Sequence, residues 1–310
     1  MFLEKAFKGK NQWYLYLVSL IIVFLTMQIA SLPFLLWRFW GNWEMLATHG
    51  GDIAALLKGI TNFELALLLF PNAIAFFILL VCIRTMHRKK ITDVATGRSR
   101  IDLKRVAYGM VVWGVLVLVM SAVQYFTADT SLLVFQFEPV KFFGMLLVVL
   151  LFIPLQVAGE EFVFRGYLMQ GFALLFRNRW MPLLLTGITF GLMHAANPEV
   201  ERFGFWMMMP QYIIIGLIMG YVAIKDDGLE LALGMHLVNN ILSAVVVTHE
   251  ASALQTHALF VDTSPTISYW DSVVLLACGI VFIVACNQKY RFWGNNSLCQ
   301  RIDPAPEESI

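Results

Sequence analysis

The chain has 310 residues, of which 59% are hydrophobic and only 14% are charged. Soluble globular proteins average about 45–50% apolar and about 25% charged residues, so this composition cannot supply a water-soluble surface. It also excludes a disordered chain, and the near balance of 22 basic and 21 acidic residues excludes a nucleic-acid-binding surface. The composition therefore predicts an all-α fold, a polytopic membrane helical bundle.

Eight apolar runs approach the length of about 20 residues that a helix needs to cross the ~30 Å hydrocarbon core. They lie near residues 13–37, 63–83, 106–126, 142–176, 181–197, 205–224, 229–248 and 271–288. The first run is too long for the apolar part of a signal peptide, so we expect it to be a retained span. The fourth is long enough to bend or to continue past the membrane surface. The runs predict about eight transmembrane helices in one domain, 1–294, followed by a short polar cytoplasmic tail, 295–310.

The basic residues predict the orientation in the membrane. Of the 22 lysines and arginines, 17 lie in alternate loops and in the two terminal segments, and eight of these are in residues 84–105. The opposite loops hold only four, Arg38, Lys58, Lys141 and Arg202. Cytoplasmic loops are enriched in lysine and arginine, so both termini are predicted to be cytoplasmic. The short loops and the lack of a retention signal favour the inner membrane of a bacterial cell.

The cysteines and four of the histidines give little indication of a site. The cysteines show no CxxC spacing and are interpreted as small apolar residues in helix packing; they are Cys82, Cys278, Cys286 and Cys299. Four histidines lie in predicted loops and are expected to be solvated; they are His49, His87, His249 and His257. A metal site on the outer face formed by His249, Glu250 and His257 is the weaker alternative.

A few polar side chains interrupt the apolar runs. An ionisable group inside a span costs roughly 2.5–3.5 kcal/mol on translocon scales, so each such residue is a functional candidate. With their immediate neighbours, the candidates are Glu160, Glu161 and Arg165 in the fourth run, Phe190 and His194 in the fifth, and His236 and Asn240 in the seventh.

Helical spacing sorts the candidates into faces. Glu161 and Arg165 are four residues apart, so we expect them to form an ion pair with a structural role. Glu160 lies about 140° from Arg165 around a helix, and without a local partner it is free to act as a general base. His236 and Asn240 share one helix face by the same spacing.

The depth of the candidates in the membrane indicates that they converge. Glu160 lies 17 residues before Arg177 in a predicted cytoplasmic turn, and His194 lies 17 residues after it. Both therefore fall roughly 25 Å from the turn, whereas His236 lies roughly 15 Å from its own loop, a difference that helix tilt can absorb. Phe190 is four residues before His194, which predicts an aromatic ring beside the imidazole.

Two kinds of chemistry fit these residue types. In the first, Glu160 takes a proton from water attacking a carbonyl, His194 positions the water, and His236 with Asn240 stabilises the oxyanion. In the second, Glu160, His194 and His236 bind Zn²⁺ and leave one position open for water. The residues alone do not separate these mechanisms.

The order of the motifs resembles one family. The fourth, fifth and seventh runs carry Glu160-Glu161-xxx-Arg165, Phe190-xxx-His194 and His236-xxx-Asn240. These motifs are similar to those of the CPBP family, the CAAX proteases and bacteriocin-processing enzymes, also called the Abi family. This family includes the Ras-converting CAAX prenyl endopeptidase. The motif-bearing core, about 142–248, covers roughly a third of the chain.

The resemblance implies an eight-helix intramembrane endopeptidase that acts on a membrane-associated peptide or protein, with prenylated CAAX proteins as one substrate class. It implies catalytic roles for Glu160, His194, His236 and Asn240, with Glu161, Arg165 and Phe190 in support. The family is named as a metalloprotease family, but the mechanism of its best-studied type is described as glutamate-dependent. We therefore favour a mechanism without a required metal and keep zinc as the alternative.

Other classes of function receive less support. The sequence contains no HExxH, no GxSxG, no P-loop and no GxGxxG motif. A non-catalytic immunity or peptide-binding factor with the same fold is the main alternative. An ion-coupled transporter that uses Glu160 and His194 as a relay is less favoured, because no inverted repeat is visible.

Overall fold

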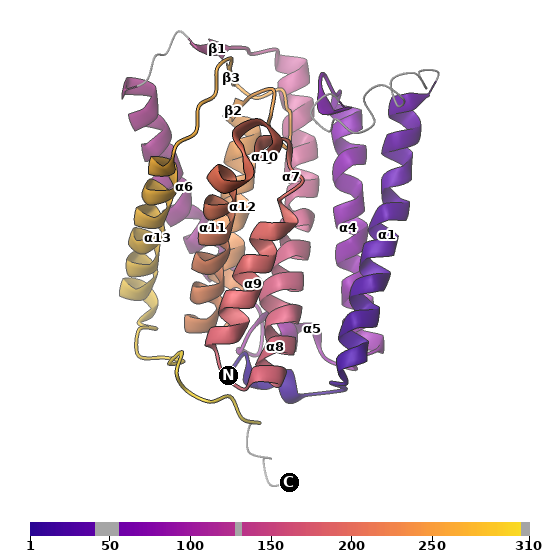
Figure 1. Ribbon diagram of the computed structural model, residues 1–310, viewed down its shortest axis with the longest axis vertical. Helices are drawn as coiled ribbons and strands as arrows, with labels where there is room; N and C mark the ends of the chain where they lie inside the picture. The colour runs from indigo at the N-terminus through magenta and orange to yellow at the C-terminus, as the bar shows by residue number, and fades with distance from the viewer. Residues whose placement is uncertain (41–55, 128–131, 305–310) are drawn as a thin grey trace.

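The structure is a computed structural model, and it describes residues 1–40, 56–127 and 132–304. These residues form a bundle of helices with a small sheet at one end (Figure 1). The α-helices are α1 (Trp13–Phe39), α4 (Asn62–Thr85), α5 (Ile91–Ala95), α6 (Leu103–Thr127), α7 (Pro139–Glu161), α8 (Met169–Phe176), α9 (Trp180–Met193), α10 (Pro198–Phe203), α11 (Phe205–Lys225), α12 (Glu230–Val245) and α13 (Tyr269–Tyr290). A short 3₁₀ helix, η1 (Glu4–Phe7), precedes α1, and a π-helix, η3 (Phe162–Leu168), joins α7 to α8.

The helices confirm an integral membrane protein of the all-α class. Within the described residues, six helical segments are long and apolar enough to cross a membrane: α1, α4, α6, the continuous stretch from α7 to α8, α11 and α13. The fifth and seventh predicted runs are also helical, but α9 has 14 residues and α12 has 16. Both are shorter than the ~20 residues that a full span needs. Eight complete spans therefore stay a prediction.

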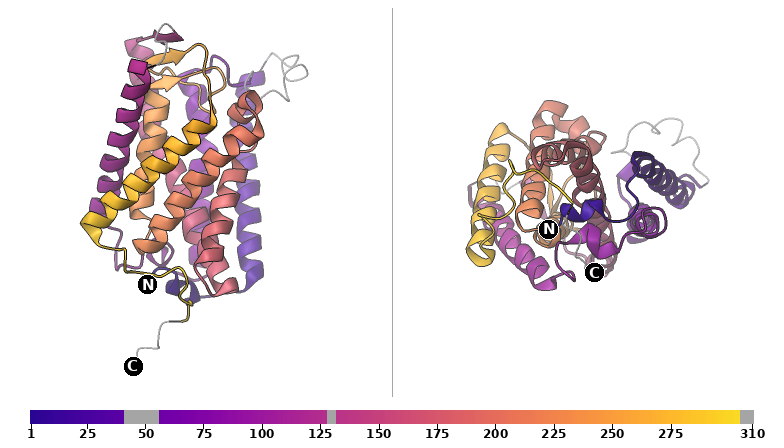
Figure 2. Two further views of the ribbon diagram at one scale, coloured as in Figure 1. Left: turned by 60° about the vertical axis from the view of Figure 1, so that its left-hand side comes forward. Right: turned by 90° about the horizontal axis from the view of Figure 1, so that it is seen from below.

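The packing order places the motif-bearing helices at the centre. Helix α7 packs against α4 on one side and α12 on the other, and α6 packs on the far side of α12. Helix α9 packs on α11, which also contacts α13, and α1 packs on α4 (Figure 2). The apolar runs thus bury their inner faces against one another. The polar residues of α7, α9 and α12 are directed into this interior.

The closest helix contact depends on glycine. A Cβ atom placed on Gly234 of α12 would overlap the carbonyl oxygen of Val106 on α6, and one on Gly109 of α6 would meet the carbonyl oxygen of Leu231. Small residues let transmembrane helices approach backbone to backbone. The contact between α6 and α12 holds α12, and with it His236, in place.

We expect the Gly234→Ala substitution to destabilise the fold, because a backbone carbonyl cannot move aside as a flexible side chain can. Overpacking typically costs about 1–3 kcal/mol, and this site lies at the upper end. Thermal unfolding in detergent measures the effect. The matched control is Gly294→Ala, where an added Cβ meets no atom within 4 Å. Equal melting temperatures for the two variants would contradict the proposed contact.

A three-stranded sheet caps one end of the bundle. It was not predicted, because its strands are short and show no alternation of apolar and polar residues. The strands are β1 (Leu133–Phe135), β2 (Val247–Thr248) and β3 (Phe260–Asp262), in the order β1-β3-β2. Strand β3 pairs antiparallel with β1, with Leu133 opposite Asp262, and parallel with β2, with Val247 opposite Phe260. Figure 1 places the sheet at the end opposite the two termini.

Both terminal segments lie at the same end of the bundle (Figure 1). The described part of the expected polar tail, residues 295–304, packs against that end. The Ile302 side chain is buried, and its backbone N–H donates to the carbonyl of Arg177 at 3.0 Å. The Arg179 guanidinium donates to the carbonyl of Gln300 at 2.9 Å. Shared placement of the termini agrees with the predicted topology, and the membrane side they face stays a prediction.

The prediction that the loop histidines are solvated is wrong for His87. Its side chain is 1% exposed. The Nδ1–H donates to the carbonyl of Lys10 at 2.8 Å, and Nε2 accepts from the hydroxyl of Tyr167 at 2.6 Å. The loop after α4 folds under the bundle, so sequence position alone did not reveal the burial. His249 and His257 are half-buried, and His49 lies outside the described residues.

Acidification is expected to weaken the fold through His87. Burial lowers the pKa of His87 below its ordinary value of 6.5. Below about pH 6.5 the unfolded chain takes up a proton at this position and the folded chain does not, so the free energy of unfolding falls as the pH drops. The His87→Gln variant should lose less thermal stability between pH 7.5 and 5.5 than the wild type. The other histidines are the same in both proteins, so equal losses would contradict this role.

Candidate active site

The first motif lies where the long helix changes its winding. Helix α7 ends at Glu161, and the π-helix η3 begins at the next residue. Arg165 lies within η3 and donates from Nη1 to Glu161 Oε1 at 2.7 Å, with both side chains fully buried. The structure therefore contains the predicted ion pair. Short π-helical segments occur frequently at functional sites, and no sequence pattern indicated this one.

Glu160 faces away from this ion pair and has a local partner that the sequence analysis missed. Gln156, one turn earlier on α7, donates from Nε2 to Glu160 Oε1 at 3.1 Å. The other carboxylate oxygen, Oε2, lies 3.7 Å from Nε2 of His236. The amide at the i−4 position was the available signal. Glu160 is thus held in one orientation and still presents an oxygen next to an imidazole.

A chain of hydrogen bonds crosses the site from α6 to α7. The indole N–H of Trp113 donates to Asn239 Oδ1 at 3.1 Å, and Asn239 Nδ2 donates to Asn240 Oδ1 at 3.3 Å. Asn240 Nδ2 lies 3.3 Å from His236 Nε2. His236 Nδ1 lies 2.8 Å from Glu161 Oε1. The structure therefore brings His236 and Asn240 together, as predicted, and joins them to the buried carboxylate on the neighbouring helix.

This series of hydrogen bonds sets the orientation of each side chain in it. An indole nitrogen can only donate, so the oxygen of Asn239 faces Trp113 and its amide nitrogen faces Asn240. The same reasoning directs Asn240 Nδ2–H to His236 Nε2, which leaves the proton of His236 on Nδ1, donated to Glu161. His236 Nε2 is then an acceptor. His236 was expected to donate a hydrogen bond to an oxyanion. In this arrangement it could do so only after taking up a second proton.

His194 follows the last residue of α9 and is fixed by three contacts. Its Nδ1–H donates to the carbonyl of Phe190 at 2.8 Å, so Nε2 carries the lone pair. The imidazole stacks on the ring of Tyr212 at 4.5 Å and also contacts the Phe190 ring at 4.8 Å. Asn197 Nδ2 donates to the Tyr212 hydroxyl at 3.2 Å. Tyr212 and Asn197 were missed, because Tyr212 lies in an otherwise apolar run of another helix.

Phe190 connects the two halves of the site. Its ring lies 5.8 Å from the imidazole of His236 in an edge-to-face arrangement, and the Arg165 guanidinium lies 4.2 Å above it. A guanidinium over an aromatic face is stabilised by the quadrupole of the ring. One side chain thus contacts both histidines and covers the buried cation. The resemblance implied a supporting role for Phe190, and the structure places its ring between the two histidines and the buried guanidinium.

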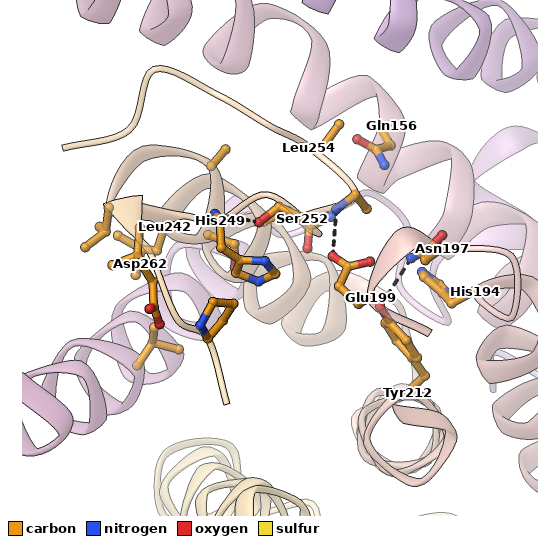
Figure 3. A pocket seen from close by; sticks show the side chains of 18 of the residues that line it. Gln156, His194, Asn197, Glu199, Tyr212, Leu242, His249, Ser252, Leu254 and Asp262 are labelled. Atoms are coloured by element: carbon orange, nitrogen blue, oxygen red, sulfur yellow. Dashed lines mark hydrogen bonds between the residues drawn. The ribbon is translucent and has the colours of Figure 1, made fainter. Parts of the chain in front are cut away.

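A cavity of about 970 Å³ gives access to these residues. Glu160, His194 and Asn240 line its inner part. It continues past Glu199 and Tyr212 towards the sheet end of the bundle. Figure 3 shows its side chains, with Gln156 and His194 on one side and His249, Ser252 and Asp262 on the other. The volume is large enough for a short stretch of peptide.

Zinc does not fit the described side chains as they are placed. No group of three His, Cys, Asp or Glu side chains in the described ranges forms a metal-binding set. This applies to Glu160, His194 and His236, and the alternative set on the outer face is not assembled either. We therefore derive no step through a metal.

The fold and the geometry define a membrane-embedded helical protein with a polar site deep in its core. The family model described as type II CAAX prenyl endopeptidase Rce1-like matches residues 139–242. This range runs from the start of α7 into α12 and contains every candidate residue of the three motifs. It confirms the resemblance to this family, which indicates an intramembrane protease kind of function.

One relative matches a longer part of the chain. The chain is 27% identical over 203 residues to the uncharacterized protein YyaK of Bacillus subtilis (strain 168), which covers 65% of this chain and 67% of the relative. The similarity thus extends well beyond the motif-bearing core of the chain.

Proposed function

We propose that the protein is an intramembrane endopeptidase that hydrolyses a peptide bond of a membrane-associated peptide or protein, with Glu160 activating the water. One observation carries the proposal. Glu160, His194 and Asn240, from three helices, line the inner part of one cavity that is large enough for peptide. The match of residues 139–242 to a prenyl endopeptidase family supports the same class of reaction.

The proposed water lies between two acceptors. The Oε2 atom of Glu160 and the Nε2 atom of His194 each accept one of its hydrogens, which turns an oxygen lone pair towards the carbonyl carbon. As the carbon–oxygen bond forms, Glu160 takes the proton. The same carboxyl group then gives the proton to the leaving amine as the carbon–nitrogen bond breaks. This sequence balances with water as the only co-reactant.

The developing oxyanion is assigned to Asn240. Its Nδ2 carries two hydrogens, one of which is used for His236 Nε2, and the second is available to substrate. A single oxyanion donor of this kind is typically worth about 10²–10³ in kcat. His236 Nε2 orients the Asn240 amide by accepting this bond, and Glu161 holds the His236 ring by accepting from Nδ1–H, as a buried carboxylate does in a catalytic triad.

The test is cleavage of a peptide library by purified protein in detergent, read by mass spectrometry. The library contains prenylated and unprenylated peptides, and each reaction is run with and without a chelator. The wild type and the Glu138→Gln control, changed at an exposed glutamate, should cleave the same bonds, and chelator should have no effect. Cleavage by Glu160→Gln at the wild-type rate would contradict the mechanism. Binding without cleavage by the wild type would favour the immunity or peptide-binding alternative.

A further inference from the structure

Of the two ends of the bundle, the described lining of the cavity reaches the sheet end. Its outer part is lined by His249, Ser252, Asp262 and Ser264, which lie in or next to the sheet. None of the lining residues that the structure describes comes from the opposite end, where the terminal segments and the loop 84–105 lie. A substrate in this cavity therefore approaches Glu160 from the sheet end.

The opposite end is closed by packed side chains. Below the Glu161–Arg165 pair lies an apolar cluster whose members are all buried, including Phe162, Tyr167, Met169, Ile224 and Leu229. The loop 84–105 covers this cluster: the backbone N–H of Leu229 donates to the carbonyl of Ala95 at 2.9 Å. Arg98 forms ion pairs with Asp226 and Glu230, each at 3.2 Å. In the described residues this end presents a sealed surface.

The charge distribution identifies the sealed end. It carries 17 of the 22 lysines and arginines, whereas the loops at the sheet end carry four. The positive-inside rule places the basic end in the cytoplasm. The open mouth of the cavity then faces the other side of the membrane.

The cavity is lined by acidic side chains. Among the described residues, three acidic side chains line it, those of Glu160, Glu199 and Asp262, and no lysine or arginine does. Glu199 Oε1 accepts from the backbone N–H of Ala253 at 2.7 Å, while Oε2 is buried without a hydrogen-bond partner. Burial raises the pKa of Glu199, and a cation placed beside it would favour its charged form. A free C-terminal carboxylate would meet no positive side chain in this lining.

We infer that the cavity receives a neutral or basic polypeptide segment from the non-cytoplasmic side of the membrane, and that the cleaved bond lies within the chain rather than beside a free C-terminal carboxylate. The statement about cleavage rests on the proposed function. The side of entry and the charge preference do not, because both are properties of the cavity. They can be measured without any substrate.

Thiol labelling in intact cells tests the side. Ser264 is exposed at the mouth, and Cys299 is a native exposed thiol at the sealed end; Cys82 and Cys286 are buried, and Cys278 is half-buried within α13 and is replaced by serine in every variant used. In a Cys299→Ser background, the Ser264→Cys protein should react with a membrane-impermeant maleimide in intact cells. Cys299 of the Cys278→Ser protein should react only after permeabilisation. Any other pattern for the pair overturns the inferred side.

The same variant tests the charge. We compare the labelling rates of two impermeant thiosulfonates, one carrying a trimethylammonium and one a sulfonate, each normalised to a free thiol in solution. Unit charges several ångströms apart in water favour the cation about threefold. The preference should fall when Asp262→Asn or Glu199→Gln is added. A normalised ratio near one, or above one for the sulfonate, overturns the inferred charge preference.

Blocking the mouth of the cavity tests whether the substrate reaches the site by this route. After Ser264→Cys has reacted with a bulky maleimide, cleavage in the peptide assay should fall at least about tenfold, because the substrate and the label occupy the same passage. Unchanged cleavage by fully labelled protein would overturn the entry route and leave the proposed activity intact. Absence of cleavage in unlabelled protein would count against the activity, while the two labelling results would still decide the side and the charge.

Discussion

The Glu160→Gln substitution is expected to reduce kcat/KM for any cleaved peptide by at least about 10³, with little effect on folding. Glutamine keeps the shape of the side chain but cannot take a proton from water, and general acid–base catalysis contributes about 10²–10⁴. The fold should tolerate the change, because Glu160 lies outside the buried ion pair and its partner Gln156 can bond to an amide oxygen as well. Steady-state cleavage and thermal unfolding on the same preparation measure both effects.

Comparing variants of the two adjacent glutamates, Glu160 and Glu161, separates the catalytic role from the structural one. If Glu160→Gln lowered the melting temperature as much as Glu161→Gln does, the assignment of one glutamate to catalysis and the other to structure would be wrong. If Glu160→Gln kept cleavage, a general base elsewhere in the cavity would have to be sought. His194→Phe retains the stacking on Tyr212 but removes Nε2, so it should share the kinetic defect without sharing the stability defect of Glu161→Gln.

The second large effect is expected for Arg165→Met. Arg165 and Glu161 are fully buried, and removal of one partner leaves an uncompensated charge in the membrane interior. Breaking such a pair typically costs about 3–5 kcal/mol. The guanidinium also donates to the carbonyl of Gly216 on α11 at 3.2 Å, so its loss loosens the packing of three helices. We expect a large fall in melting temperature together with loss of activity.

Two further variants test whether the loss of stability comes from the unpaired buried charge. The double variant Glu161→Leu/Arg165→Met removes both charges and should be more stable than Arg165→Met alone, although inactive because His236 loses its carboxylate. The matched surface control is Arg202→Met, which breaks an exposed pair with Glu250 at 3.7 Å. Exposed pairs contribute little, so this change should be nearly silent. Equal destabilisation by Arg165→Met and Arg202→Met would contradict the structural role of the buried pair.

Helical spacing alone predicted three contacts within single helices, although it missed the bond from Gln156 to Glu160. The Glu161–Arg165 pair, the His236–Asn240 contact and the ring of Phe190 beside His194 all join residues four apart, and helix geometry brings such residues together in any context. The fourth run was expected to bend or to continue past the membrane surface; it forms one helical stretch of 38 residues, and the π-helix within it was not foreseen.

Contacts between helices were beyond the reach of that reasoning. The bond from His236 to Glu161 joins residues 75 positions apart, and the one from Trp113 to Asn239 joins residues 126 apart. No local pattern encodes such pairs, because they depend on how α6, α7 and α12 pack. His87 was wrongly placed in solvent for the same reason, since its partner Tyr167 is 80 residues away.

The shortness of α9 has a consequence for the surrounding lipid. Its 14 residues are about 21 Å long, roughly 9 Å less than the hydrocarbon thickness. One face of the helix is exposed along Leu184, Ile188 and Leu192, and lipid is expected to cover it. A short hydrophobic segment is accommodated by local thinning of the bilayer. On this flank the headgroup region therefore dips towards His194, and water reaches the level of the site without crossing a full acyl layer.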